Sequence, residues 1–342
     1  MSVAARTMLA VEEEARRRRR EELVRVLGST IGGALADPNV VEVMVNEDGA
    51  VWIDELVGGM RETDLRMAAI EVEDVITTIA SALGKSIDRR NPSLQGELPL
   101  DGSRVQAFMP PATESAPALV IRKKATRIFT LADYVAAGIL APAHAARLGA
   151  AVRERQVVLI VGGTGSGKTT LVNALLAATA ETTPRDRLVI IEDTRELQSP
   201  SRNKVHLIKS ETRSYTQLLK ESLRTRPDRL VFGELRDEAA FDFLMALNTG
   251  HRGSFSTIHA NSARDALSRL EDLVRVAGHP AVPSTIARAI DLLVFIERTG
   301  DTRRVTEVAS LRGLGPADTY ELEYVEPSAP NHSNTREVSH AT

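Results

Sequence analysis

A glycine-rich loop between a predicted strand and a predicted helix constrains the fold of this chain more than any other feature. Residues 162–169 read GGTGSGKT and match the pattern G-x-x-x-x-G-K-[ST] at every fixed position. The β-branched run at 157–161 precedes the loop, and a predicted helix at 170–179 follows it. In this setting the loop backbone and the helix N-terminus direct N–H groups at phosphate oxygens. A chance glycine-rich turn is the alternative, and the flanking strand and helix argue against it.

The loop predicts a nucleotide site with a role for each residue. Glycines let the backbone curl around a phosphate group. Lys168 is expected to reach the β- and γ-phosphates, and the Thr169 hydroxyl is expected to ligate Mg²⁺. The predicted nucleotide-binding residues are Gly162, Gly163, Thr164, Gly165, Ser166, Gly167, Lys168, Thr169 and Thr170.

Strand-like and helical segments alternate around and after this loop, which indicates a largely parallel sheet wound with helices. Helical spacing covers 131–138 and 142–153, and further strands are expected at 188–192, 205–208, 229–233, 254–258 and 292–296. We therefore expect an α/β domain at residues 142–314, preceded by a linker at 126–141. The tail at 315–342 lacks periodicity and is expected to be disordered.

The first 125 residues predict a separate small α+β domain. Alternation of apolar and polar residues at 40–57, around Asp48-Gly49, indicates a β-hairpin. Helical spacing covers 69–83. Three more strands are expected at 96–100, 104–108 and 118–122.

Residues 10–27 predict one charged helix in this domain. Glu12, Glu13 and Glu14 each lie four positions before an arginine, the favourable order for ion pairs on a helix. The five arginines at 16–20 can contact an anionic membrane or DNA. We favour a solvated helix with internal ion pairs, because the preceding glutamates neutralise much of the run.

Three further side chains are predicted at the carboxyl ends of strands. Glu192 and Glu234 each follow an apolar run, and His259 follows the strand-like segment 255–258. Taken singly, each acid is equally consistent with a functional residue and with a loop residue or a helix cap. Because ligands of wound sheets gather at the carboxyl ends of strands, we expect the two acids beside the phosphate loop to be functional. His259 can hydrogen-bond a γ-phosphate from its position, but taken alone it is more consistent with a structural role.

Composition excludes several other kinds of site. The chain has no cysteine, which excludes disulfides, thiolate zinc sites, iron–sulfur clusters and a cysteine nucleophile. Its 43 basic and 46 acidic residues give a net charge of −3, which argues against nucleic-acid binding through bulk positive charge. No apolar run approaches the roughly 18 residues of a membrane-spanning helix, and we expect a cytoplasmic protein.

Four segments, in this order, are similar to the motifs of the type II/type IV secretion ATPase superfamily. GGTGSGKTT (162–170) resembles its Walker A motif, IEDTREL (191–197) its Asp box, LRTRPDRLVFGELRD (223–237) its Walker B motif and GHRGSFSTIHAN (250–261) its His box. The similarity extends over about residues 20–312. The segments LRTRPD and ALNTGHRGS resemble the VirB/Trb branch of type IV secretion, and the four-cysteine insert of type II members has no counterpart here.

The resemblance implies a RecA-like P-loop NTPase domain, a homo-hexameric ring, and ATP and Mg²⁺ as ligands. It implies that Glu192 activates water, that Glu234 holds magnesium or polarises the nucleophile, and that His259 is the His-box histidine. It also implies a basic residue of the N-terminal domain at the γ-phosphate, for which Arg122 fits best and Arg104 second. A guanidinium suits that role because its rigid fork offers two hydrogen bonds to phosphate oxygens.

The expected function is magnesium-dependent ATP hydrolysis that powers conjugative type IV secretion, in pilus biogenesis or DNA transfer. Lys168, Glu192, Glu234 and His259, with Arg122 and Arg104, are the expected catalytic residues. The implied partners are inner-membrane components of the secretion machine; peripheral membrane contact stays open, and sequence-specific nucleic-acid binding is not expected. A pilus assembly or retraction motor of the same superfamily is one alternative. A nucleotide-responsive scaffold that barely hydrolyses ATP is another.

Overall fold

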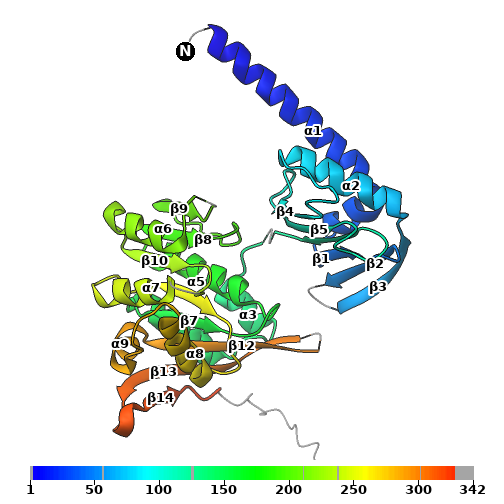
Figure 1. Ribbon diagram of the computed structural model, residues 1–342. Helices are drawn as coiled ribbons and strands as arrows, with labels where there is room; N and C mark the ends of the chain where they lie inside the picture. The colour runs from blue at the N-terminus through cyan, green and yellow to red at the C-terminus, as the bar shows by residue number, and fades with distance from the viewer. Residues whose placement is uncertain are drawn as a thin grey trace, which may run out of the picture. The chain divides into compact units, whose positions relative to one another are not determined.

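The chain forms two compact units. The computed structural model describes residues 3–55, 58–124, 127–210, 212–236, 239–300 and 302–327, with the side chains of 3–12 and of residue 16 outside the description. The first unit comprises residues up to Arg127, together with Thr194–Glu196 and Thr299–Thr302, and the second comprises the rest (Figure 1).

The first unit is a six-stranded antiparallel sheet with two helices packed on one face. The strand order is β3-β2-β1-β6-β5-β4. The elements are α1 Val3–Ala36, β1 Val40–Val45, β2 Ala50–Glu55, β3 Gly59–Arg66, α2 Ala69–Ala82, β4 Ser93–Glu97, β5 Arg104–Phe108 and β6 Ala118–Arg122. Alternate residues of the central strands and one side of each helix share a single hydrophobic core, which includes Leu23, Ile76 and Ile121.

Two strands of this unit differ from the sequence prediction. β3 was not predicted, because this edge strand is mostly exposed and carries no apolar alternation. The strand predicted at 96–100 is wrong in its bounds, since β4 ends at Glu97 and a turn closed by the Gly102 N–H and the Leu98 carbonyl follows at 2.8 Å.

Helix α1 extends beyond the predicted 10–27 at both ends. Gly28 interrupts its helical geometry with φ 55° and ψ −159°, and Leu27 and Ile31 on either side of this break are buried. The predicted ion pair between Arg18 and Glu14 is present at 3.0 Å, and Arg17 also pairs with Glu14. These exposed pairs favour the solvated interpretation for this part of the helix.

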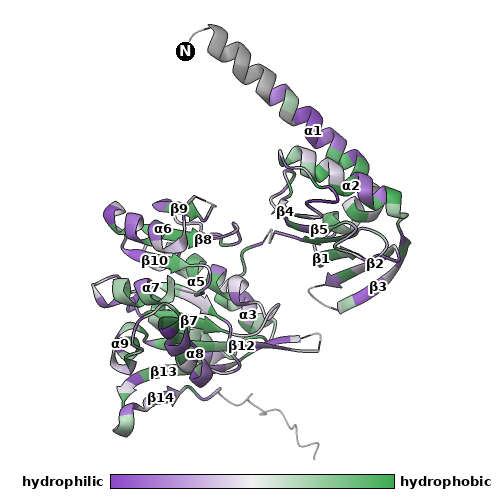
Figure 2. Cartoon of the chain, viewed as in Figure 1, coloured by the Kyte–Doolittle hydropathy of each residue, from purple (hydrophilic) through white to green (hydrophobic). Residues whose placement is uncertain are grey.

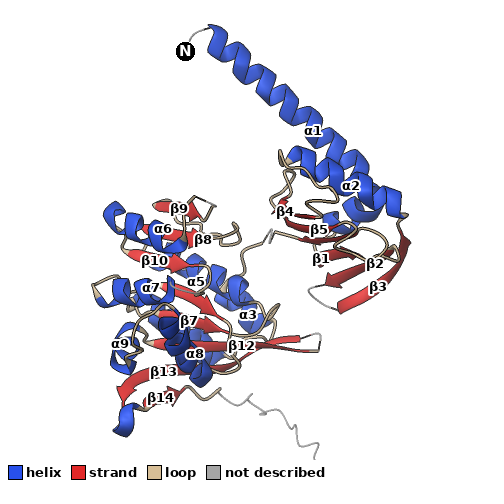
Figure 3. Ribbon diagram, in the orientation of Figure 1, coloured by secondary structure: helices blue, strands red, loops and turns tan. Residues whose placement is uncertain are grey.

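The second unit is an eight-stranded sheet wound with helices (Figure 3). The wound, largely parallel arrangement is as predicted, whereas the last two strands, at 302–314 and 320–324, were not predicted. The strand order is β14-β13-β12-β7-β11-β10-β8-β9, and the neighbours from β12 to β9 are parallel. The strands are β7 Val158–Val161, β8 Leu188–Glu192, β9 Lys204–Ile208, β10 Arg229–Phe232, β11 Phe255–Ile258, β12 Leu292–Thr299, β13 Thr302–Leu314 and β14 Tyr320–Tyr324. The helices are α3 Leu131–Ala136, α4 Pro142–Arg153, α5 Lys168–Thr182, α6 Tyr215–Ser222, α7 Ala239–Asn248, α8 Ala263–Val276 and α9 Pro283–Ala289.

Both faces of this sheet are buried. Side chains such as Ile160 and Ile190 pack under α3, α4 and α5, whereas their sequence neighbours Leu159 and Ile191 pack under α6, α7, α8 and α9. Burial on both faces explains why the central strands are continuous apolar runs, and β7 is accordingly green in Figure 2. The helices and strands together fix the phosphate loop between β7 and α5.

Two boundaries at the ends of this unit differ from expectation. Residues 128–141 belong to the second unit, with Tyr134 and Leu140 in its core, so the linker predicted at 126–141 is too long. The expected disorder from Gly315 is wrong up to residue 327, because β14 pairs with β13 and Leu322 packs on the core. Residues 328–342 lie outside the described residues.

Within the described ranges, no helix has the length and apolar character that crossing a bilayer requires.

A buried ion pair joins several elements of the second unit. Arg229 at the start of β10 is fully buried, and its Nε donates to Asp186 at 2.7 Å. Its other nitrogens donate to the Gly253 carbonyl at 3.0 Å and the Val152 carbonyl at 2.9 Å. Burial works to raise the pKa of Asp186, but hydrogen bonds from Arg229 and Thr183 and the charge of Arg229 hold that pKa below its ordinary value.

We expect Arg229→Ala to destabilise the protein by about 3–5 kcal/mol, because it removes the buried one of the two arginines that pair with Asp186 and leaves the buried Gly253 and Val152 carbonyls without that donor. Arg275→Ala is the matched control, since Arg275 pairs with Glu271 and Asp272 on the exposed side of α8 and its removal should cost at most about 1 kcal/mol. Urea denaturation at several pH values measures both. The ionised Asp186 contributes to the free energy of unfolding at pH values above its unfolded pKa of about 3.9. That contribution is lost as pH falls through the lowered pKa of the folded state. Equal losses for the two variants would contradict this assignment.

Candidate nucleotide-binding site

The phosphate loop has a conformation that its glycines make possible. Gly165 and Gly167 have φ of +69° and +98°, the left-handed region that side chains other than hydrogen disfavour. A Cβ atom at Gly162 would lie 2.2 Å from the Ile296 carbonyl oxygen of β12, so the backbone itself needs a glycine there. The loop ends at Gly167, which caps the N-terminus of α5. The predicted strand–loop–helix setting is confirmed.

Lys168 lies in the first turn of α5 and is 8% exposed. Its ammonium donates to the carbonyl oxygens of Gly162 at 2.9 Å and Gly163 at 2.7 Å. The same nitrogen lies 3.4 Å from Nδ1 of His259. The charge of Lys168 is therefore placed at the centre of the loop.

The loop residues fit a phosphate ligand. The Ser166 hydroxyl is buried, and among the described residues it has no hydrogen-bond partner. The Thr169 and Thr170 side chains are half-buried in the first turn of α5, and Thr164 at the outer part of the loop is exposed. A buried hydroxyl, an ammonium and a helix N-terminus together match the oxygen acceptors of a phosphate group.

Glu234 is positioned by backbone contacts between β10 and β11. The Leu235 N–H donates to the Thr257 carbonyl at 2.8 Å, and the Thr257 hydroxyl donates to the Gly233 carbonyl at 2.8 Å. Both neighbours of Glu234 are thus fixed to β11, whose next residue after the strand is His259. Parallel pairing therefore brings these two side chains together, as the sequence predicted.

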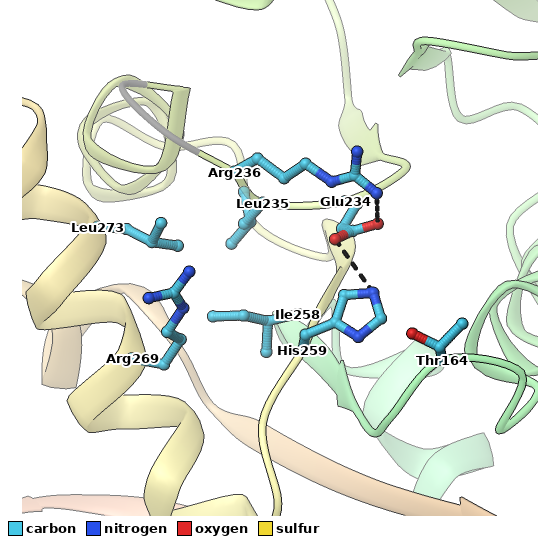
Figure 4. A pocket seen from close by; sticks show the side chains of 8 residues that line it. All are labelled: Thr164, Glu234, Leu235, Arg236, Ile258, His259, Arg269 and Leu273. Carbon is cyan, nitrogen blue, oxygen red and sulfur yellow. Dashed lines mark hydrogen bonds and ion pairs between the residues drawn. The ribbon is translucent and has the colours of Figure 1, made fainter. Parts of the chain in front are cut away.

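A chain of polar contacts runs from the phosphate loop to Arg236. His259 Nε2 lies 3.3 Å from Glu234 Oε1, and Arg236 donates to Glu234 Oε2 at 2.7 Å (Figure 4). Arg236 also lies 4.0 Å from Asp193, the residue after β8. With the Lys168–His259 contact, these pairs connect the loop, the end of β11, the end of β10 and the end of β8.

The charged groups along this row of contacts shift the pKa values of His259 and Glu234. Burial, and then the positive charge of Lys168, lower the pKa of His259, whereas Glu234 raises it. A neutral imidazole fits its neighbours, with Nδ1 accepting from Lys168 and the Nε2–H donating to Glu234. Burial acts to raise the pKa of Glu234, but the Arg236 hydrogen bond and the charges of Arg236, His259 and Lys168 keep it below the ordinary value.

A pocket of about 370 Å³ opens beside this chain of contacts. Figure 4 shows Arg269 and Leu273 of α8 on one side and Thr164 of the phosphate loop on the other. The pocket is lined by Thr164, Glu234, Leu235, Arg236, Ile258, His259, Arg269 and Leu273.

Glu192 has different partners from Glu234. Glu192 is the last residue of β8, and the residue as a whole is 2% exposed. Oε1 accepts from the Leu197 N–H at 2.8 Å, and Oε2 contacts His206 Nε2 of β9. The predicted water-activating acid is thus a buried carboxylate held from two sides.

The two predicted arginines lie side by side in the first unit. Arg104 on β5 and Arg122 on β6 are cross-strand partners in register. Arg104 lies 3.4 Å from Glu196, and Glu42 of β1 stands opposite Arg122 on its other side. Like charges directly opposite on neighbouring strands are destabilising, and Glu196 beside Arg104 offsets part of that repulsion.

Three functional candidates are absent from the residues expected from the sequence. Arg236 lies inside the Walker B segment and was not among the expected catalytic residues, yet it pairs with Glu234. Arg303 of β13 donates to the Gly165 carbonyl at 3.2 Å, and nothing local in its sequence signals that contact. His206 falls on the predicted strand 205–208. Its one sequence signal was the alternation of side chains along a strand, which decides the face of the sheet on which each residue lies. His251, by contrast, bonds the Ala246 carbonyl, a structural contact.

Among the residues that the structure describes, no group of three or more histidine or acidic side chains is arranged to hold a metal ion by itself. A magnesium ion in this site would depend on ligands from the nucleotide, with Thr169 and Glu234 as the predicted protein ligands. Oxygen donors of this kind are those that Mg²⁺ prefers.

The chain is similar to known proteins over most of its length. A family model described as type II/IV secretion system protein matches residues 35–302. Conjugal transfer protein TrbB of Rhizobium radiobacter is 43% identical over 295 residues, or 85% of this chain and 91% of that protein. Protein VirB11 of Agrobacterium fabrum is 33% identical over 325 residues, or 83% and 92%. The X-ray structure of the Legionella pneumophila ATPase DotB shares the fold, with a TM-score of 0.57 and 21% identity over 79% of this chain and 76% of that one.

We expect His259 to titrate below 6.5 in the protein free of nucleotide and magnesium, and NMR of the imidazole carbons measures the midpoint. Lys168→Met should raise that midpoint, because it removes a neighbouring positive charge. Glu234→Gln should lower it further, because it removes the negative charge that stabilises the imidazolium. His279, which stacks on Phe241, serves as the internal reference. A midpoint insensitive to both substitutions would rule out the contacts described for His259.

Proposed function

Because this chain belongs to the type II/IV secretion system protein family, in its VirB/Trb branch, we propose that it is a magnesium-dependent ATPase that powers conjugative type IV secretion. The relatives that support this are named as a conjugal transfer protein and as VirB11. The chain covers 91% and 92% of those two relatives, so the comparison extends over nearly the whole of each.

One observation carries the enzymatic part of the proposal: His259 lies between the phosphate-loop lysine and the Glu234 carboxylate. A loop that only bound phosphate would need Lys168 and the helix N-terminus. The additional acid, kept ionised by Arg236 and Lys168, supplies a negative group beside the expected position of the γ-phosphate. Hydrolysis of a nucleotide needs such a group, to hold magnesium or to orient water.

ATP is the proposed substrate, and each loop residue has a task toward it. Lys168 exchanges the Gly162 and Gly163 carbonyls for β- and γ-phosphate oxygens. His259, neutral at pH 7, donates its Nε2–H to Glu234 and fixes the orientation of that carboxylate. Magnesium, held by Thr169 and Glu234 together with phosphate oxygens, would neutralise charge that develops on the γ-phosphoryl group.

Two further roles belong to the proposal. Glu192 activates the attacking water, and an arginine of the first unit, Arg122 before Arg104, neutralises the γ-phosphoryl group in the transition state. Such an arginine can contribute about 10³–10⁵-fold in rate. The side-by-side placement of the two arginines supports an anion-binding role for this part of the first unit.

We also propose that the chain acts as a homo-hexameric ring with inner-membrane components of the secretion machine as partners. A ring lets domain closure on one nucleotide influence the neighbouring subunit, which converts hydrolysis into movement. The relatives' roles in conjugal transfer support conjugation over the alternative of a pilus assembly or retraction motor.

Lys168→Ala should abolish magnesium-dependent ATP hydrolysis and weaken ATP binding, because the loop loses its cation. Glu234→Gln should retain binding and lower kcat by about 10²-fold or more. A fluorescent ATP analogue measures binding, and phosphate release measures turnover. Lys220→Ala is the matched control, since Lys220 forms an exposed pair with Asp242 on α6 and α7 and should keep wild-type turnover.

Wild-type turnover in Lys168→Ala would contradict the site assignment. Tight ATP binding by the wild-type chain without turnover, at any protein concentration, would instead favour the nucleotide-responsive scaffold.

Specific activity should rise with protein concentration as hexamers form, because the proposed ring completes the active state. Mass photometry on the assay samples gives the fraction of each oligomer. Full specific activity in a monomer would contradict the ring mechanism while leaving the ATPase assignment in place.

A further inference from the structure

The Glu192 carboxylate is held at both oxygens inside the second unit. Oε1 accepts from the Leu197 N–H at 2.8 Å, and Oε2 contacts His206 Nε2. In the contact between Glu192 and His206, the Glu192 side chain is 3% exposed and the His206 side chain is 15% exposed. A buried carboxylate without such partners would be costly, so these contacts determine where Glu192 can point.

The strand register brings His206 to Glu192. In the parallel pair of β8 and β9, Ile190 is opposite His206 and Glu192 is opposite Ile208. Residues two apart on a strand share a face, so Glu192 and His206 are diagonal neighbours on the α5 side of the sheet. Leu197, whose N–H holds the other oxygen, belongs to the hydrophobic core on that same side.

β10, which pairs with β8 on the side opposite β9, also restricts the position of the Glu192 side chain. The Gly233 N–H, directly after β10, donates to the Ile191 carbonyl at 2.9 Å. A Cβ atom at Gly233 would lie 3.1 Å from Cγ of Glu192, which is tighter than ordinary contact. Glu192 therefore sits against a glycine backbone on the β10 side and against His206 on the β9 side.

We propose that His206 is a positioning residue for Glu192, which it holds in the orientation needed to activate water. This inference rests on the proposed role of Glu192 in ATP hydrolysis. His206 acts through the carboxylate and does not touch the substrate. A carboxylate has about four acceptor positions, so an orientation set by His206 is compatible with a hydrogen bond from a water molecule.

The experiment compares His206→Ala, His206→Gln and His279→Ala in the full-length chain, each with and without Glu192→Gln. We expect His206→Ala to lower kcat by about 10–100-fold with KM for ATP within about twofold, since a misplaced catalytic group affects the chemical step. His206→Gln should restore part of kcat, because its amide N–H can donate to Oε2. His279→Ala should retain wild-type kcat.

The decisive result is the double variant. If His206 acts through Glu192, then His206→Ala should cause no further loss of kcat in the Glu192→Gln background. Thermal unfolding and binding of the fluorescent ATP analogue identify variants that have simply lost their fold, and His206→Gln then carries the comparison.

Other outcomes are separable. Unchanged kcat in His206→Ala, or an equal additional loss in the Glu192→Gln background, would overturn the positioning role. Unchanged kcat in Glu192→Gln alone would remove Glu192 from the mechanism, and His206 with it, whereas the Lys168 and Glu234 assignments would stand. A wild-type chain without turnover would overturn the proposed function itself.

Discussion

Parallel pairing of the central strands is the constraint on which the candidate site depends. β7 lies between β11 and β12, and β10 and β8 follow β11 in the same direction. Because all carboxyl ends meet at one edge, the phosphate loop, Glu192, Glu234 and His259 emerge there from four strands. The buried pair of Arg229 and Asp186 stabilises the same sheet at the start of β10, away from this edge.

The electrostatics of the site follow from a small number of shared charges. Lys168 lowers the pKa of both His259 and Glu234, by repelling the imidazolium and stabilising the carboxylate. Arg236 acts on Glu234 in the same sense and is itself held charged by that carboxylate. Burial and Lys168 thereby keep the histidine neutral, and Arg236 and Lys168 keep the acid ionised. A neutral imidazole suits hydrogen bonding, and an ionised carboxylate suits cation binding.

The two acids of the site have different environments. Glu234 lines an open pocket and is bonded to charged neighbours, whereas Glu192 is buried against Gly233 and held by His206 and Leu197. Their equivalent positions after apolar strands do not reveal this difference. The neighbouring strands explain the difference between the two acids. β9 pairs with β8 and brings His206 to Glu192, whereas β11 pairs with β10 and brings His259 to Glu234.

The sequence by itself determined the phosphate loop, the alternation of strands and helices, and the gathering of Lys168, Glu234 and His259. Each follows from local signals: glycines where left-handed backbone is required, apolar runs buried on both faces, and polar residues directly after those runs. Only the tertiary structure decided which side chains touch. Residues distant in sequence are joined by the contacts of His206 with Glu192 and of Arg303 with Gly165. The strand order that places β7 between β11 and β12 likewise joins distant segments. Strand register and strand order create those contacts, and a periodic pattern within one segment carries no information about its neighbour.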